Sequence, residues 1–295
     1  MNNIMNIKEV PAFLHIPKNS GTYAIAVINR LFRHYIIKKH DINPKNIDNV
    51  LYRVQVKDKK YICFTLFLYD KDSLCLTDNR IRKNKKYKNI FDISIKNFEK
   101  LCSEKGESLS IFSLVVESYG TQYIRNNFLK NLESVFGIKF LWFTVLREEF
   151  FRQQSLYNYI RSKESKHELT HGRIKSETFE EYISSHECDC CWLIRSLSGN
   201  QSTEITEENF NAACDILNNF LIDKHTNITD ILDIVFKRCY EITTDIISDL
   251  PEIYRHQTKY EKILMSDINP EILENFLKRA NFENQIYKKY IKQED

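Results

Sequence analysis

The stretch FLHIPKNSGTYAIAVINRLF, residues 13–32, joins a short apolar run to a helical pattern through the turn Pro17-Lys18-Asn19-Ser20-Gly21. Residues 11–16 predict a β-strand, because they are apolar and end at a proline and a glycine. Residues 22–39 predict an amphipathic helix that ends in basic side chains. A strand, a tight turn and a helix in this order are typical of an α/β protein.

The turn in this stretch has the features of an anion site. The first N–H groups of a helix have no partner within it, and the helix dipole adds to their attraction for an anion. Gly21 would let the backbone approach the anion, Thr22 could cap the helix or donate to an oxygen, and Lys18 would add a mobile charge. The stretch is not a Walker A loop, because its lysine precedes the glycine. The alternative is an ordinary strand–helix turn with a solvated lysine.

The composition indicates one soluble domain over residues 1–295. The chain has 6 glycines and 5 prolines in 295 residues, too few for a linker-rich protein. Its net charge of +3 does not require a nucleic-acid partner. The sequence has no 18-residue apolar run and no pattern of a signal peptide, so we expect no membrane span and a cytoplasmic location. Its 8 cysteines are accordingly expected to be reduced.

Strand and helix patterns alternate in the first half of the chain. We expect further strands at residues 61–70, 111–118 and 139–147. The last of these, KFLWFTVLR, is apolar throughout, as buried parallel strands are. We expect helices at 94–104, 121–135, 148–163, 176–186, 207–222, 227–240 and within 269–292. This order predicts a three-layer α/β fold with a central parallel sheet and a helix-rich C-terminal part.

A second candidate anion-binding segment follows the most apolar strand. Arg147 stands at the carboxyl end of that strand and Ser155 eight residues later in the expected helix. Ligands of open α/β sheets bind at the carboxyl ends of the strands, and an arginine fork with a hydroxyl suits a phosphate. The alternative is that Arg147 pairs with Glu148 or Glu149.

These two segments together resemble the sulfotransferases that use 3′-phosphoadenosine 5′-phosphosulfate (PAPS). HIPKNSGT is similar to the PKTGGT loop of that family. TVLREEFFRQQSLYNY is similar to its LR-D-P-x-x-R-x-x-S-x-Y-x-Y segment, with Arg152 and the Tyr157-x-Tyr159 pair in register. LIRSLSGN (193–200) and NFENQIYKKYIKQ (281–293) resemble later motifs, Q-T-R-x-L-S-G and N-x-x-D-x-x-L-Y-x-x-A, of the heparan and uronyl 2-O-sulfotransferase branch.

The resemblance implies a P-loop-like sulfotransferase fold and a set of cofactor contacts. The 5′-phosphosulfate would lie in the loop formed by Lys18, Asn19, Ser20, Gly21, Thr22 and Tyr23. Arg147 and Ser155 would hold the 3′-phosphate, with Arg195 as a further phosphate contact. Leu197, Ser198 and Gly199 would lie near the cofactor. Lys18 would stabilise the charge that develops on the leaving phosphate of 3′-phosphoadenosine 5′-phosphate (PAP), so the reaction needs no metal.

The general base of this branch is the point where the chain departs from the pattern. The branch carries a histidine in a G-H-x-P-[FY]-G segment, whereas residues 115–120 here are VVESYG. Glu117 is therefore the candidate base. The alternative is that Glu117 faces solvent or pairs with a lysine. His15 is expected to be a structural histidine.

Two further segments and two rival functions stay open from the sequence. HECDCC (186–191) is crowded for a zinc site, and its cysteines are expected to pack inward from a helix. The basic segment 79–88 is expected to be a solvated loop, although it could bind an acidic acceptor or nucleic acid. The expected partner is a small-molecule or glycan acceptor. The rivals are an ATP-dependent phosphotransferase that uses the same loop and a non-catalytic nucleotide-binding module.

Overall fold

The computed structural model of the chain describes the greater part of the sheet and of the C-terminal helices. The described residues are 9–21, 23–28, 30–31, 47–50, 53–56, 62–68, 109–117, 121–127, 129–130, 133–134, 137–161, 174–200, 202, 204–241 and 262–291. The expected helix at 94–104 and the basic segment 79–88 lie outside them.

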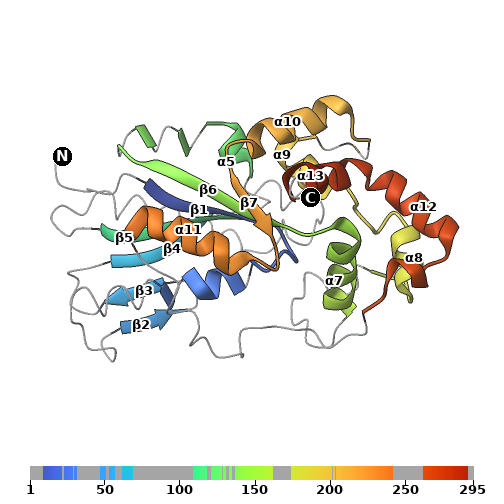
Figure 1. The fold of residues 1–295 in the computed structure, drawn as a ribbon, viewed down its shortest axis with the longest axis horizontal. Helices are drawn as coiled ribbons and strands as arrows, with labels where there is room; N and C mark the ends of the chain where they lie inside the picture. Colours follow the sequence, from blue (N-terminus) through green and yellow to red (C-terminus); the bar gives the residue numbers. More distant parts are fainter. Residues whose placement is uncertain are drawn as a thin grey trace, which may run out of the picture.

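A 7-stranded sheet in the order β2-β3-β4-β5-β1-β6-β7 forms the centre of the molecule (Figure 1). Its strands are β1 (Glu9–His15), β2 (Ile47–Val50), β3 (Arg53–Val56), β4 (Ile62–Leu68), β5 (Leu109–Glu117), β6 (Lys139–Leu146) and β7 (Leu221–Lys224). All pairings from β4 to β7 are parallel, and β2 and β3 add an antiparallel edge. The predicted parallel sheet is thus confirmed for the centre.

Alternate residues of the central strands face two separate apolar cores. Phe13 of β1 and Phe143 of β6 stack on one face, where α11 (Ile228–Tyr240) and the helical residues of the segment 21–31 pack. Ala12 and Leu14 face the opposite core. That core is covered by α5 (Thr121–Arg125), α9 (Trp192–Ser198), α10 (Glu207–Leu217) and α13 (Asn281–Ile291). Helices on both faces of a sheet make the three layers that the alternation predicted.

A third cluster of helices lies beyond the carboxyl ends of the strands (Figure 1). It is built from α7 (Glu149–Arg161), α8 (Phe179–Ser184), the 3₁₀ turn η5 (Met265–Asp267) and α12 (Pro270–Arg279). Its core contains packed rings, with Phe150 in edge contact with Phe179 and with Phe276. Because α7 starts directly after β6, this cluster is held against the sheet edge at which α/β proteins bind ligands.

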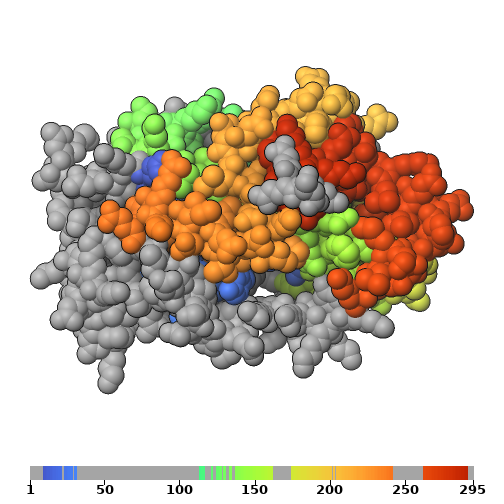
Figure 2. Space-filling model, in the orientation of Figure 1, coloured from blue at the N-terminus to red at the C-terminus, as the bar shows by residue number. Residues whose placement is uncertain are grey.

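The space-filling view agrees with the central position of β1. In Figure 2 the blue N-terminal residues appear on this face only as small patches beside the orange residues of the α11 region. Val10, Ala12, Phe13 and Leu14 of β1 are all fully buried.

None of the helices in the described ranges is long and apolar enough to cross a membrane.

Three sequence-based predictions are wrong in detail. The helix expected at 207–222 stops at Leu217, and residues 221–224 form the edge strand β7. The helix expected at 121–135 is interrupted: α5 ends at Arg125, Asn127 takes a φ of 56° in the left-handed region, and residues 129–130 and 133–134 are helical again. The segment HECDCC lies between α8 and α9 as a turn and not as a helix.

Candidate functional site

The turn after β1 is a tightly constrained loop that begins a helix. The Asn19 N–H donates to the Ile16 carbonyl (3.1 Å), and the Ala24 N–H donates to the Ser20 carbonyl (3.0 Å). Lys18 and Ser20 have φ values of 68° and 59°, a conformation that costs a non-glycine residue about 1–2 kcal/mol. Such conformations persist where the surrounding structure enforces them, and they concentrate at functional sites.

Asn19 fixes this loop to the neighbouring strand. Its side chain is 3% exposed, and Nδ2 donates to the Val145 carbonyl of β6 (3.1 Å). Its other side-chain atom, Oδ1, is buried and has no hydrogen-bond partner within the described part of the chain. The ring of His15 lies against Gly21 in the space that a Cβ atom would need. Packing against the His15 ring, and not a positive φ, therefore favours a glycine at this position.

Lys18 and Arg147 meet at the carboxyl ends of β1 and β6. Burial and the nearby charge of Arg147 lower the pKa of Lys18 to about 8. The Lys18 Nζ lies 4.0 Å from the centroid of the Tyr159 ring of α7. Arg147 Nε is buried without a hydrogen-bond partner, and among the described residues no carboxylate forms an ion pair with Lys18 or Arg147. Two neighbouring cations without a counter-charge make a site that favours an anion.

His225, immediately after β7, completes the positive corner. Its backbone N–H donates to the Leu146 carbonyl (3.0 Å), and its carbonyl accepts from the Ser20 hydroxyl (3.3 Å). Burial and the charge of Arg147 lower the pKa of this histidine to about 4. The imidazole is therefore neutral at physiological pH and can donate or accept a hydrogen bond.

Ser155 shares a helix face with Tyr159. The two residues are four apart in α7 and thus lie one turn from each other on the same side. Ser155 is 6% exposed. Because the Tyr159 ring contacts Lys18, the face with Ser155 is directed towards the loop. The structure thus brings together the predicted residues Lys18, Asn19, Ser20, Gly21 and Arg147, and it places Ser155 one helical turn from the tyrosine that contacts Lys18.

The other predicted site residues are placed differently. The Tyr23 side chain packs against the apolar core, so only its backbone N–H is available to an anion. Glu117 ends β5 as the ladder partner of His15, but its side chain lies outside the described part, as does Thr22.

The predicted contacts in α9 form a separate group. Leu197 is fully buried in the core, and Ser198 Oγ accepts from the Asn200 N–H (3.3 Å). Gly199 caps α9 with a φ of 77°, and the Arg125 guanidinium of α5 lies against it. Arg195 pairs with Asp189 and donates to the Ser202 carbonyl (2.9 Å). No contact among the described residues connects Arg195 with Lys18 or Arg147.

Behind the loop lies a buried polar cluster that the sequence did not reveal. Arg152 Nε and Nη2 both donate to the Glu149 carboxylate at 2.6 Å, and both residues are buried. Gln153 Nε2 donates to Glu149 (2.6 Å) and to the Asp189 carbonyl (2.6 Å), and the Tyr182 hydroxyl donates to Gln153 (2.6 Å). The spacing Glu149–Arg152 was visible in the sequence, but its burial was not.

Glu283 of α13 belongs to the same region. Its Oε1 accepts the backbone N–H groups of Leu193 (2.8 Å) and Ile194 (3.2 Å) at the start of α9. Burial and the charge of Glu149 raise the pKa of Glu283 to about 8. A small cavity separates these carboxyl groups from the loop. It is lined by Ile16, Asn19, Leu146, Arg147, Glu149, Arg152, Leu193, Glu283, Ile286 and Tyr287.

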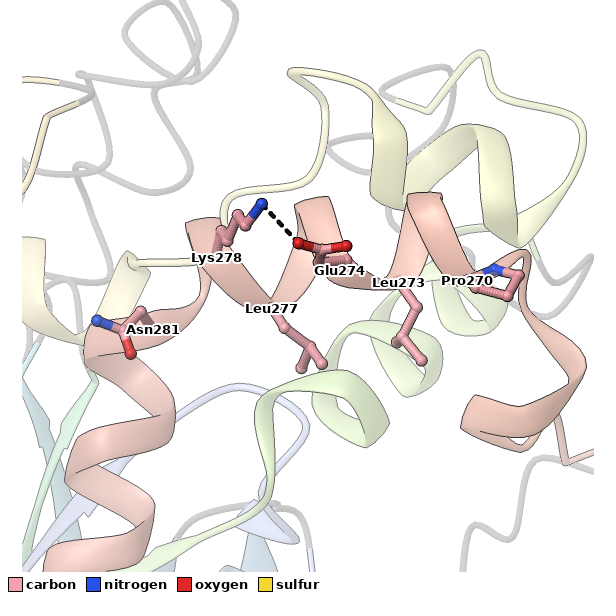
Figure 3. Close-up of a pocket in the computed structure, with 6 residues that line it drawn as sticks. All are labelled: Pro270, Leu273, Glu274, Leu277, Lys278 and Asn281. Atoms are coloured by element: carbon pink, nitrogen blue, oxygen red, sulfur yellow. Dashed lines mark ion pairs between the residues drawn. The ribbon is translucent and has the colours of Figure 1, made fainter.

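A second, more open hollow lies elsewhere, along α12 (Figure 3). Its wall combines the apolar side chains of Leu273 and Leu277 with an exposed ion pair between Glu274 and Lys278 (2.7 Å). It contains none of the predicted site residues. Within the described ranges no group of three or more side chains is arranged to hold a metal ion.

The geometry therefore gives a positively charged corner at the carboxyl edge of a parallel sheet, beside the helix that starts at Gly21, and such a corner suits an anion. Comparison of the chain with protein-family models, with curated proteins and with solved structures gave no significant match. What the site binds must be inferred from its own chemistry and from the motifs of the sequence.

Proposed function

We propose that the chain is a sulfotransferase that binds PAPS and transfers its sulfuryl group to a hydroxyl of a small-molecule or glycan acceptor. The observation that carries this proposal is that Lys18 and Arg147, beside the loop 16–21, have no carboxylate partner within the described ranges. The motif resemblance adds the identity of the anion, a nucleotide with phosphate groups at both its 3′ and 5′ positions. Under this proposal the α/β architecture is the P-loop-like sulfotransferase fold.

Each described residue then has a defined task. The loop N–H groups and Lys18 bind the 5′-phosphosulfate, and Arg147 and Ser155 bind the 3′-phosphate. Lys18 stabilises the charge that builds up on the bridging oxygen as the bond from sulfur to that oxygen breaks. Burial makes this charge effect stronger than it would be in water.

The transfer also requires an acceptor hydroxyl in line with the breaking bond and a base for its proton. The acceptor oxygen forms a bond to sulfur, PAP leaves with the bridging oxygen, and the hydroxyl proton passes to the base. Glu117 is our proposed base, because it stands at the carboxyl end of β5, paired in the ladder with His15 next to the loop.

Calorimetric titration with PAP tests the cofactor site, with ATP and 5′-AMP as competing nucleotides. We expect PAP to bind most tightly and Arg147→Ala to weaken it by about 10- to 100-fold, as for a lost charge-assisted contact of about 1.5–3 kcal/mol. Arg238→Ala is the matched control, since it removes the same charge from a pair with Glu9 at the amino end of β1. Preference for ATP, or equal binding by both variants, would contradict the proposal.

Glu117→Gln separates the enzyme from a non-catalytic binding module. An enzyme that uses this base loses turnover in a sulfate-transfer assay and keeps its affinity for PAP. A variant with undiminished transfer would remove Glu117 from the mechanism.

A further inference from the structure

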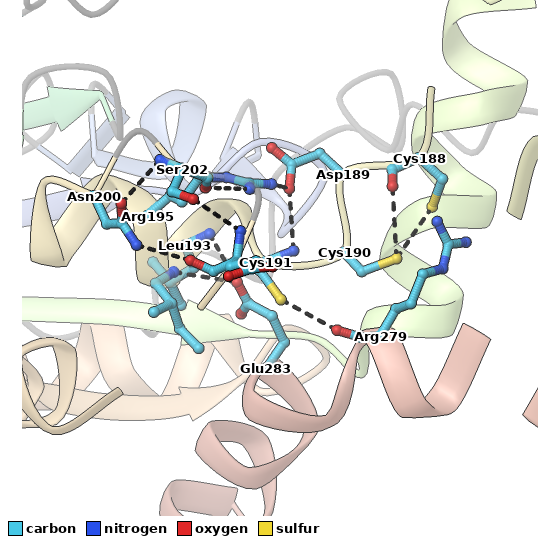
Figure 4. Close-up of polar contacts among 12 residues, drawn as sticks. Cys188, Asp189, Cys190, Cys191, Leu193, Arg195, Asn200, Ser202, Arg279 and Glu283 are labelled. Atoms are coloured by element: carbon cyan, nitrogen blue, oxygen red, sulfur yellow. Dashed lines mark hydrogen bonds and ion pairs between the residues drawn. The ribbon is translucent and has the colours of Figure 1, made fainter. Parts of the chain in front are cut away.

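The turn HECDCC between α8 and α9 brings two thiols into contact. Cys188 Sγ and Cys190 Sγ are 3.5 Å apart, and the two residues are 4% and 5% exposed (Figure 4). Cys191 points elsewhere, since its Sγ donates to the Arg279 carbonyl (3.2 Å). The crowded cysteines thus separate into a pair and a single thiol.

The surroundings make the two paired thiols unequal. The hydrogen bond with Cys188 lowers the pKa of Cys190, and Arg279 acts in the same direction against the effect of burial. The same hydrogen bond, together with burial, raises the pKa of Cys188. A thiolate is the reactive form of cysteine, so the direction of these pKa shifts favours Cys190 as the attacking thiol and Cys188 as the resolving thiol.

We propose that Cys188 and Cys190 are a redox-active dithiol that a peroxide oxidises to an intrachain disulfide. Cys190 sulfur attacks one peroxide oxygen, the O–O bond breaks, and a sulfenic acid and one water or alcohol are formed. Cys188 sulfur then displaces the hydroxyl group of the sulfenic acid as water. Both sulfurs are oxidised, the peroxide is reduced, and the two thiol protons leave in the products.

Closing this bond shifts a peptide that joins two helices. A disulfide requires an S–S distance of about 2.05 Å, so the two side chains must approach each other across Asp189. The Asp189 carbonyl accepts from Gln153 (2.6 Å) and Arg152 (3.4 Å) of α7, and its carboxylate pairs with Arg195 of α9 and accepts the Cys191 N–H (3.1 Å). Oxidation is therefore expected to change the hydrogen bonds through which Asp189 connects α7 to the start of α9.

Trypsin provides a direct assay of the pair. Cleavage after Lys175 and Arg195 releases a peptide that contains Cys188, Cys190 and Cys191. We treat the full chain with increasing hydrogen peroxide, alkylate under denaturing conditions, digest and weigh this peptide. We expect three alkyl groups before oxidation and one afterwards, on Cys191, with reversal by dithiothreitol.

Variants assign the reaction to the pair. Cys188→Ala and Cys190→Ala should each abolish the loss of two alkylation sites, whereas Cys214→Ala, which removes a buried thiol of α10, should leave it unchanged. The proposal is overturned if the peptide keeps three alkyl groups at peroxide doses that oxidise the half-buried Cys239. It is also overturned if Cys190 stops at a sulfinic acid or if the bond forms with Cys191.

The fluorescence of Trp192 provides a second measurement on the folded protein. This residue follows the turn directly, and the Arg152 guanidinium lies 5.9 Å from its ring centroid. In a Trp142→Phe background, which leaves one of the 2 tryptophans, we expect a reversible change in emission on oxidation. An unchanged spectrum in a protein whose disulfide has formed would remove the proposed link to α7. This outcome is independent of whether the chain binds PAPS.

Discussion

Two neighbouring groups of charged side chains differ in how their charges are satisfied. A small cavity lies between them, lined by Arg147 from one group and by Glu149, Arg152 and Glu283 from the other. On the loop side, burial and the charge of Arg147 lower the pKa of Lys18, and neither residue forms an ion pair with a carboxylate among the described residues. On the inner side, Arg152 is held by both oxygens of Glu149, and Glu283 caps the start of α9. The inner group has its partners within the fold, whereas the loop group lacks one. The comparison suggests that a ligand, and not the protein, completes the outer group.

The largest effect is expected from breaking the inner ion pair. Arg152→Met leaves the buried Glu149 carboxylate without its cation, which typically costs about 3–5 kcal/mol of stability. Urea unfolding followed by circular dichroism measures this loss. Arg147→Met is the matched control at the outer group, and there we expect no loss of stability. Equal destabilisation by both variants would remove the distinction between the groups.

The next effect concerns the pH dependence of the inner group. Because the pKa of Glu283 is raised to about 8 in the folded protein, its contribution to stability is present below about pH 4.5 and is lost as the pH rises towards 8. Glu283→Gln keeps an oxygen for the N–H groups of Leu193 and Ile194 but cannot ionise. We expect the variant to be more stable than the native protein at pH 8 by a few kcal/mol, and equal to it near pH 4.

A pH series of urea unfolding curves measures the difference between the two proteins. A constant difference from pH 4 to pH 8 would show that folding does not raise the pKa of Glu283, and the prediction would then be wrong.

A smaller effect of opposite sign is expected at the outer group. Lys18→Met preserves most of the side-chain volume and removes a buried cation from beside Arg147. We expect a gain in stability of about 1–2 kcal/mol at pH 7. The gain should disappear as the pH rises from 8 to 10.5, because native Lys18 is then neutral in the folded protein. A loss of stability at pH 7 would indicate that Lys18 already has a counter-charge.

The smallest effect is on binding. If the site takes PAP, its affinity should be nearly constant below pH 7 and fall by about tenfold between pH 7 and pH 9, as Lys18 loses its proton. Lys18→Arg should bind without this fall, because an arginine remains charged. Calorimetry in buffers of equal ionic strength separates this titration from salt effects. The same fall in both proteins would assign it to another group.

The sequence predicted the elements with strong patterns and missed those that depend on tertiary packing. The strands at 11–16 and 139–147 and the helix after Arg147 were predictable, since apolar runs and turn residues define them locally. β7 was missed because its four residues, Leu221–Lys224, are too few to show the alternation of apolar and polar side chains that marks a strand. They also come shortly after an amphipathic helix, whose pattern extends into them. His225 was missed for the same reason, because it reaches the candidate site only as the residue that directly follows β7.

The same holds for the candidate site: features that follow from local sequence patterns were predictable, and features that depend on tertiary packing were not. The proximity of Lys18 to Arg147 followed from their position at the carboxyl ends of parallel strands. The pairing of Arg195 with Asp189 did not, because the turn at 188–191 was expected to be helical. The burial of Glu149 and Glu283 could not be predicted either, since charged residues on a helix are exposed by default.

The position of β1 at the middle of the sheet has a consequence for synthesis of the chain. Among the described strands β1 is synthesised before the others, but both of its neighbours come much later, and the Asn19 side chain bonds to a carbonyl 126 residues further along. Contacts this distant in sequence close slowly, after a large loss of chain entropy. A nascent chain shorter than β6 thus has the residues of the loop but not the support that holds Lys18 and Ser20 in their left-handed conformations. We expect the anion-binding corner to be a late product of folding, formed when β6 and β7 join the strand that was made first.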